Sequence, residues 1–136
     1  MRCRKDGYYV NRHSCFLLQY HLVLVTKYRH PVITDALEKR LKEYTLKYFK
    51  DRSCVILALE FMPDHIHILF DAPPQINMAD FINAYKSASS RIIKQEFPAI
   101  RTKLWKEFFW SSSYCLITTG GVTTEIIRKY ILSQGE

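Results

Sequence analysis

The sequence lacks the features that define several classes of protein. None of its four cysteines forms a C-x-x-C pair, and their spacing does not match a zinc-binding framework. No stretch approaches the roughly 18–20 apolar residues that a membrane-spanning helix needs. The charged N-terminal residues are not followed by the apolar segment of a signal peptide. Without repeats or low-complexity segments, we expect a cytoplasmic protein with free thiols and no membrane association.

The composition is that of a globular protein with a basic charge balance. The 136 residues are 48% hydrophobic and 24% charged, which indicates a single domain with a hydrophobic core. Twenty lysines and arginines against 13 acidic residues give a net charge of +7. This excess favours an anionic partner, with nucleic acid first, although a solvated basic surface without a ligand is equally compatible with it.

The pattern of apolar residues predicts four strands and three helices. Strands are expected at 17–26, 54–62, 65–70 and 112–119, and helices at 35–50, 78–97 and about 123–133. Thr34 is expected to cap the first helix through its hydroxyl. The order β-α-β-β-α-β predicts an α+β, ferredoxin-like split βαβ fold, with a four-stranded antiparallel sheet and an added C-terminal helix. This fold has many functions, so it does not identify one.

The side-chain repeat of a strand or helix predicts which of its residues share an apolar face. The strand at 54–62 is expected to place Val55, Leu57, Leu59 and Phe61 on one face, because side chains alternate along a strand. On the helix at 78–97, the expected buried stripe is Phe81, Tyr85, Ala88 and Ile92.

Two histidines in the third predicted strand form the most distinctive local motif. His65 and His67 lie two residues apart, so their side chains project from the same face, while Ile66 and Ile68 face the other way. Two adjacent imidazoles on a strand are half of a metal site. One histidine alone is more often a structural residue than a metal ligand. Two histidines do not complete a metal site, so the remainder of the chain must supply the other ligands.

Tyr130 and Gln134 are candidates for that other half. They are four residues apart on the last predicted helix, which places them on one helix face. If this helix docks over the sheet, Gln134 offers a neutral oxygen ligand and Tyr130 a phenol nucleophile. A divalent ion held by the two histidines and Gln134 would neutralise charge on a phosphate, so the set fits phosphoryl transfer.

The ordered motifs resemble those of a known family. His65-Ile66-His67 followed by Tyr130-x-x-x-Gln134, together with the stretches 20–29, 62–67 and 85–91, is similar to the single-tyrosine HUH transposases of small bacterial and archaeal insertion sequences. The similarity spans about residues 13–134. Residues 1–12 form an N-terminal extension without a motif, and the single transposase domain fills the chain.

The resemblance implies a function and roles for individual residues. Members of the family are homodimers that bind DNA hairpins at the ends of a mobile element. They cut and rejoin single-stranded DNA through a 5′-phosphotyrosine intermediate, usually with Mg²⁺ or Mn²⁺. It assigns metal binding to His65, His67 and Gln134 and makes Tyr130 the nucleophile. The helix at 122–134, after a hinge at Gly120-Gly121, often completes the partner's site in trans.

Other residues have weaker assignments. Candidate DNA contacts are Arg12, Lys27, Arg29, Lys86, Ser90 and Arg91, which could instead form a solvated surface. His21, in the first strand, is expected to be a core histidine bonded to backbone. Core or dimer packing is favoured over base stacking for Trp105, Phe108, Phe109 and Trp110.

Three alternatives remain. One is a domesticated relative that acts on genomic repeat hairpins with the same chemistry. A second is a non-catalytic ferredoxin-like module that binds nucleic acid, which would need aromatic side chains on the open sheet face. A histidine-triad nucleotide hydrolase fits less well, because position 69 is leucine rather than a third histidine.

Overall fold

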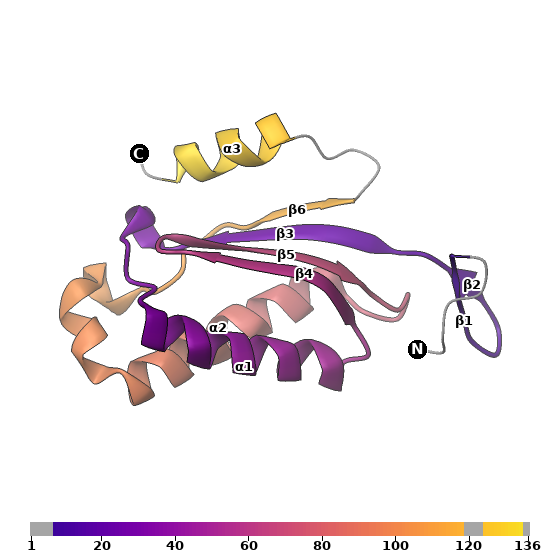
Figure 1. Ribbon diagram of the computed structural model, residues 1–136, viewed down its shortest axis with the longest axis horizontal. Coiled ribbons are helices and arrows are strands. Elements are labelled where there is room, and N and C mark those ends of the chain that lie inside the picture. Colours follow the sequence, from indigo (N-terminus) through magenta and orange to yellow (C-terminus); the bar gives the residue numbers. More distant parts are fainter. Residues whose placement is uncertain (1–6, 119–123, 135–136) are drawn as a thin grey trace.

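The computed structural model describes residues 7–118 and 124–134. Its centre is a four-stranded antiparallel sheet in the order β4-β5-β3-β6. The strands are β3 (Gln19–Val25), β4 (Val55–Met62), β5 (His65–Asp71) and β6 (Cys115–Thr118). Helices α1 (Asp35–Asp51) and α2 (Met78–Glu96) cover one face, and α3 (Thr124–Ser133) lies on the other (Figure 1). The predicted ferredoxin-like arrangement is confirmed.

The core lies between the sheet and the two long helices. Ile66, Ile68 and Phe70 of β5 are fully buried there, because alternate residues of a strand face the same side. Leu22 and Leu24 of the neighbouring β3 are also fully buried. The predicted split of β5 into an apolar helix-side face and a histidine face is therefore correct. None of the described helices is long and apolar enough to cross a membrane.

Helix α1 begins at the predicted place but without the predicted cap. Thr34 has the extended backbone of an N-cap residue, yet its hydroxyl makes no capping hydrogen bond, so that prediction was wrong. In α2, Asn77 does cap the helix, since its side chain accepts a hydrogen bond from the Asp80 amide. The buried face of α2 also shifts along its second half, to Ser89 and Ile93 rather than Ala88 and Ile92.

A β-bulge changes the faces of edge strand β4. The register with β5 shifts between Ile56 and Ala58, so the residue between them adds one position to the strand. As a result Val55 and Leu57 are exposed, at 40% and 44%, whereas Leu59 packs against the core. The prediction that all the alternate apolar residues share one face was therefore wrong.

Strand β6 is shorter than predicted because a bulged segment precedes it. Val23 pairs with Cys115, and Thr26 forms an isolated bridge with Trp110. Two residues separate Val23 from Thr26, but four separate Trp110 from Cys115. These four, residues 111–114, include three consecutive serines and are called the serine segment below.

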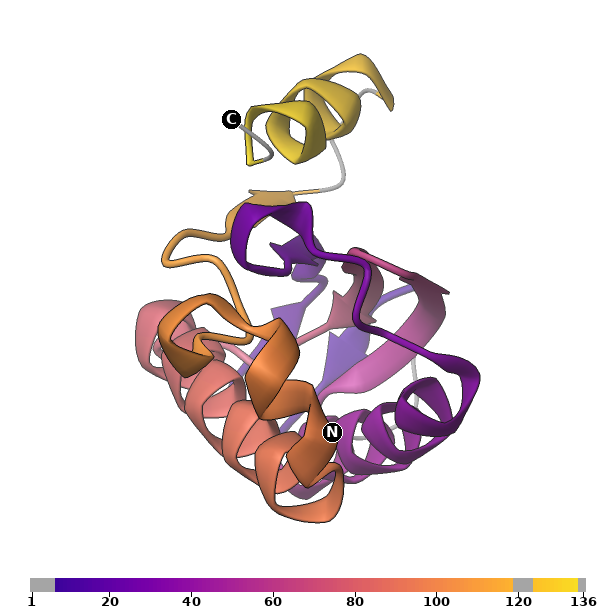
Figure 2. The same ribbon diagram turned by 90° about the vertical axis from the view of Figure 1, so that its left-hand side faces the viewer.

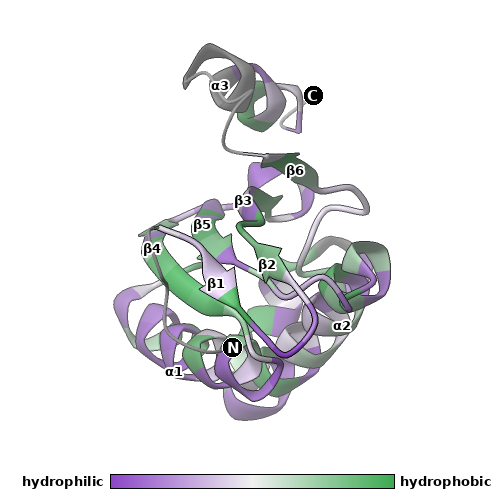
Figure 3. Cartoon of the chain, turned by 90° about the vertical axis from the view of Figure 1, so that its right-hand side faces the viewer, coloured by the Kyte–Doolittle hydropathy of each residue, from purple (hydrophilic) through white to green (hydrophobic). Residues whose placement is uncertain are grey.

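The described part of the N-terminal extension forms a hairpin. Strands β1 (Tyr9–Val10) and β2 (Cys15–Phe16) pair beyond one end of the main sheet (Figure 3). Tyr9 is buried, and its hydroxyl donates to Asp71 Oδ2 at the end of β5 over 2.5 Å. The hairpin is thus tied to the central strand.

Three short 3₁₀ elements connect the layers: η1 (Lys27–Arg29), η2 (Pro98–Lys103) and η3 (Trp105–Glu107). Figure 2 shows η2 and η3, in orange, running from the end of α2 toward β6. Two consecutive residues of η3, Lys106 and Glu107, have positive φ values of 49° and 62°. Non-glycine residues adopt such angles rarely, so the tertiary contacts fix this turn.

Phe49 should be among the most sensitive core positions. Its side chain is fully buried and makes edge-to-face contacts with Phe70 and Phe81. We expect Phe49→Ala to lower the free energy of unfolding by about 3–5 kcal/mol, measured by urea denaturation. Leu46→Ala, on the exposed side of α1 at 44% exposure, is the control and should cost far less. Equal losses in the two variants would contradict this packing.

Candidate active site on the histidine face of β5

His65 and His67 lie on the sheet face opposite α1 and α2, and a third histidine joins them. His21 Nδ1 is 2.8 Å from His67 Nε2, and the two rings stack with centroids 5.1 Å apart. The expectation of a core histidine bonded to backbone was therefore wrong for His21. The register between β3 and β5 brings His21 next to His67, because His21 pairs with Leu69 and so lies diagonally from His67.

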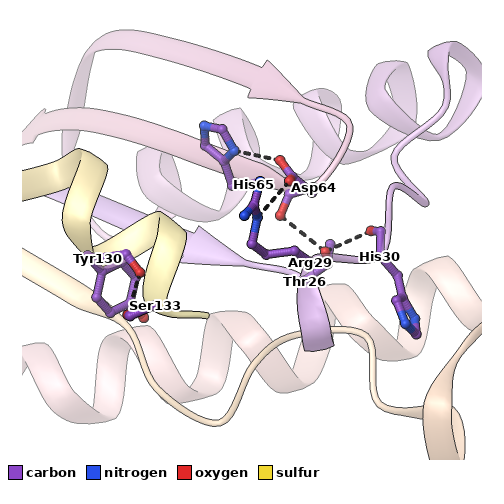
Figure 4. Close-up of polar contacts among 7 residues, drawn as sticks. All are labelled: Thr26, Arg29, His30, Asp64, His65, Tyr130 and Ser133. Atoms are coloured by element: carbon purple, nitrogen blue, oxygen red, sulfur yellow. Dashed lines mark hydrogen bonds and ion pairs between the residues drawn. The ribbon is translucent and has the colours of Figure 1, made fainter. Parts of the chain in front are cut away.

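The turn before β5 orients His65. Asp64 Oδ1 lies 2.8 Å from His65 Nδ1, and Asp64 Oδ2 accepts a hydrogen bond from Arg29 Nε over 3.2 Å (Figure 4). Burial raises the pKa of Asp64, but the bonds to His65 and Arg29 outweigh it and lower the pKa overall. The carboxylate thus stays charged, and it leaves Nε2 of His65 as the ring nitrogen available to a ligand.

Burial also sets the charge state of the other two imidazoles. It lowers the pKa of His67, and the neighbouring His21 and His65 lower it further, against a smaller opposite effect of Glu60. Burial lowers the pKa of His21 as well. Both rings are therefore neutral near pH 7, the form in which histidine binds metals.

Helix α3 presents Tyr130 and Gln134 to the serine segment. The Tyr130 hydroxyl is 2.9 Å from Ser113 Oγ. Gln134 Oε1 accepts hydrogen bonds from Ser111 Oγ at 2.5 Å and from Ser113 Oγ at 3.0 Å. Burial raises the pKa of Tyr130 above its ordinary value of 10.0. Helix α3 ends at Ser133, so Gln134 lies in the turn just beyond it rather than on the predicted helix face, although both side chains reach the same serines. These serines had no sequence signal.

The serine segment places these α3 residues one strand away from the histidines. The Ser111 amide donates to the Val25 carbonyl over 2.8 Å, and Val25 pairs with His65. Among the described residues, no hydrogen bond joins Tyr130 or Gln134 to His65 or His67. Nucleophile and histidines therefore belong to one sheet face without being in contact.

The donor set of this face suits a divalent ion. His65 and His67 offer imidazole nitrogens, and a carboxylate fixes the ring of His65, as is usual for metal-binding histidines. Gln134 would add an amide oxygen, which is at present held by the serines. Within the described ranges no three His, Cys, Asp or Glu residues form a metal-binding group, so a third protein ligand would have to be of another type.

The predicted DNA contacts separate into three places. Lys27, Lys86, Ser90 and Arg91 line one cavity between α2 and residues 108–112. Arg29 instead pairs with Asp64 beside the histidines. Arg12 is exposed in the turn of the β1–β2 hairpin.

The predicted aromatic cluster divides between core and surface. Phe109 and Trp110 are buried as expected, and Trp110 Nε1 donates to Ser89 Oγ over 3.0 Å. Phe108 does not lie in the core, because 53% of it is exposed, and the expected alternative of dimer packing stays a prediction. The Trp105 side chain and the predicted hinge Gly120-Gly121 lie outside the described residues.

Known proteins are similar to this chain in sequence. The family described as "Transposase IS200 like" matches residues 14–134. The chain is 37% identical to the ISDra2 transposase TnpA of Deinococcus radiodurans over 119 residues, covering 88% of this chain and 85% of that protein. It is 28% identical to the transposase for insertion sequence element IS200 of Salmonella typhimurium over 124 residues, covering 91% and 81% of the two.

Two solved structures resemble the fold. The crystal structure of a candidate transposase from Deinococcus radiodurans R1 superposes with a TM-score of 0.86 at 36% identity, over 93% of this chain and 97% of that one. A REP-associated tyrosine transposase bound to a REP hairpin gives a TM-score of 0.58 at 13% identity, over 90% of this chain and 68% of that one. The second likeness concerns the fold alone.

Proposed function

The chain belongs to the IS200-like transposase family, and on that basis we propose that it binds DNA hairpins and cuts and rejoins single-stranded DNA through a 5′-phosphotyrosine intermediate. The observation that carries this proposal is the meeting of two motifs on one sheet face. His65 and His67 project from β5, and α3 brings Tyr130 and Gln134 to the same side.

The residues divide the reaction between them. Tyr130 Oη loses its proton to solvent and attacks the scissile phosphorus, so that a bond to tyrosine forms, the bond from phosphorus to the 3′-oxygen breaks, and that oxygen takes up a proton from solvent. The reverse attack by a 3′-hydroxyl breaks the phosphotyrosine bond and rejoins the strand. His65, His67 and Gln134 would hold Mg²⁺ or Mn²⁺, which when bound neutralises charge on the phosphate. Asp64 keeps the ring of His65 in place.

In the described position, α3 is docked in a resting arrangement. The Tyr130 hydroxyl is bonded to Ser113, and burial raises its pKa, which makes the phenol a poorer nucleophile. Gln134 is likewise occupied by serines. We infer that α3 leaves this position for catalysis and completes the site of a second subunit in a homodimer.

The open sheet face argues against a purely DNA-binding module. A sheet that stacks bases presents aromatic side chains, whereas β5 presents His65 and His67, with His21 beside them on β3. Two histidines on one strand face, with the carboxylate of Asp64 orienting the ring of His65, suit a metal rather than a base.

A denaturing gel tests the proposal directly. The protein is incubated with Mg²⁺ and labelled single strands taken from the DNA that flanks its own coding sequence. We expect a covalent protein–DNA adduct that survives denaturant, together with a free strand ending in a 3′-hydroxyl. If the strands bind but form no adduct with either Mg²⁺ or Mn²⁺, the catalytic proposal is wrong and the protein is a binding module.

The metal role predicts a graded effect of two substitutions. We expect His65→Ala to reduce adduct formation to the level seen in EDTA, since one of the two strand ligands is lost. Asp64→Asn should raise the Mn²⁺ concentration needed for half-maximal adduct by about 10–100-fold, because an orienting carboxylate is lost. Asp51→Asn, an exposed carboxylate at the end of α1, is the control and should change nothing. Adduct formation that persists in EDTA would rule out the metal role.

A further inference from the structure

A basic cavity adjoins the candidate active site. It has a volume of about 730 Å³ and lies between α2 and residues 108–112, with Lys27 of η1 at one side. Five cations line it: Lys27, Lys86, Arg91, Lys94 and Arg101. None of its lining residues is acidic. Such a concentration of one charge favours a polyanion.

The hydrogen bonds of Lys86 and Lys94 leave the charge of these two cations uncompensated. Lys86 Nζ donates to the Ser113 carbonyl at 3.2 Å and Lys94 Nζ to the Glu107 carbonyl at 3.0 Å, and both acceptors are neutral. Burial lowers the pKa of Lys86, and the charge of Lys27 lowers it further. Arg101 differs from these two lysines, because its Nη1 lies 3.4 Å from the Glu107 carboxylate. A bound phosphate would relieve the repulsion between Lys27 and Lys86.

An exposed aromatic ring completes the cavity. Phe108 lines it with 53% of its surface exposed, and Lys27 Nζ lies 5.8 Å from its ring centroid. The positive φ angles of Lys106 and Glu107 turn the chain immediately before this ring. Cations that follow a backbone, beside an aromatic ring that stacks a base, are the usual elements of single-strand binding.

The cavity and the nucleophile share the serine segment as a common wall. Ser111 lines the cavity and also donates to Gln134. The Ser113 carbonyl binds Lys86 of the cavity, while its hydroxyl is bonded to Tyr130. A strand held in the cavity would therefore continue across the serine segment toward His65, because the Ser111 amide donates to the Val25 carbonyl and Val25 pairs with His65.

We propose that this cavity binds the single-stranded DNA next to the scissile phosphate, with phosphates on Lys27, Lys86 and Arg91 and one unpaired base stacked on Phe108. This inference rests on the proposed function, because it places the substrate of that reaction. Base stacking on Phe108 makes the site selective for single strands, since a paired base has no free face to offer.

Fluorescein-labelled oligothymidylate tests the phosphate contacts. Anisotropy titrations in EDTA, where no cleavage occurs, give the affinity across a salt series. We expect Arg91→Ala to lower the slope of log K against log salt concentration by about 0.7, the value for one phosphate contact on a single strand. Lys42→Ala removes the same charge from an exposed position on α1 and should leave the slope unchanged.

Stacking is tested on the same probe. We expect Phe108→Leu to weaken binding by about 5- to 150-fold with an unchanged salt slope, and Phe108→Tyr to bind like the wild type. Circular dichroism melting of each variant checks the fold. A duplex of the same sequence should bind the Phe108→Leu variant and the wild type equally, because its bases are paired.

The outcomes separate this inference from the proposed function. If both Arg91→Ala and Phe108→Leu bind oligothymidylate like the wild type, while the wild type forms its covalent adduct, the cavity is not the strand site. An equal loss for single strand and duplex in Phe108→Leu would likewise overturn base stacking. If the variants weaken binding as expected but no strand ever forms an adduct, the cavity binds DNA and the catalytic proposal fails.

Discussion

Tyr130→Phe is expected to abolish the covalent protein–DNA adduct while leaving the affinity for the same DNA strand within about twofold. The substitution removes only the hydroxyl oxygen, which is the atom proposed to form the bond to phosphorus. No other tyrosine is presented by α3, so no residue of the helix can replace it. The ring remains, and with it the packing that half-buries Tyr130. Adduct on a denaturing gel and anisotropy of the unreacted complex measure the two effects.

Tyr44→Phe is the matched control for Tyr130→Phe. Tyr44 is also partly buried, but it lies on α1, on the opposite side of the sheet, where its ring stacks on Tyr85. Loss of its hydroxyl should leave adduct formation unchanged. If Tyr130→Phe still formed the adduct, another nucleophile would have to be sought. A loss in both variants would instead indicate a general effect on folding.

Local periodicity was sufficient to predict the two halves of the site. A strand repeats every two residues, so His65 and His67 had to share a face, and the apolar Ile66 and Ile68 had to define the other. A helix brings residues four apart together, and Tyr130 and Gln134 do face the serine segment side by side. These inferences needed no knowledge of distant contacts.

The contacts around the histidine half and the tyrosine half of the site depend on strand register and could not be predicted from the sequence. His21 meets His67 because of how β3 and β5 pair, and the chain separates them by 46 positions. The serine segment arises because two more residues lie between Trp110 and Cys115 than between Thr26 and Val23, with which they pair. Similarly, the bulge in β4 reversed the exposure of Val55 and Leu57. Alternation along a sequence cannot reveal such insertions.

Mixing two inactive variants is expected to restore adduct formation if α3 completes the site of the partner subunit. One variant is Tyr130→Phe, with intact histidines, and the other is His67→Ala, with an intact tyrosine. Random exchange of subunits makes half of the dimers mixed, and each mixed dimer holds one complete site of two. The mixture should therefore reach about a quarter of wild-type adduct, whereas each variant alone gives none.

The contacts of the docked helix make this exchange physically reasonable. Among the described residues, three side-chain hydrogen bonds join α3 to the serine segment, through Tyr130 and Gln134. Each contributes about 0.5–1.5 kcal/mol, so the loss of these three bonds costs a few kcal/mol. The five residues between β6 and α3 let these two elements separate by at most about 22 Å. A partner's helix can thus reach these histidines only from a dimer joined near β6.

The same experiment has an outcome that excludes sharing of the site. If α3 acts only on its own subunit, every mixed dimer holds one site without a nucleophile and one without His67, and the mixture stays inactive. Co-expression with two affinity tags ensures that mixed dimers are present before the assay. Inactive mixed dimers would mean that Tyr130 moves from Ser113 to the histidines of its own chain, with the serine segment as the resting position of a helix that never leaves its subunit.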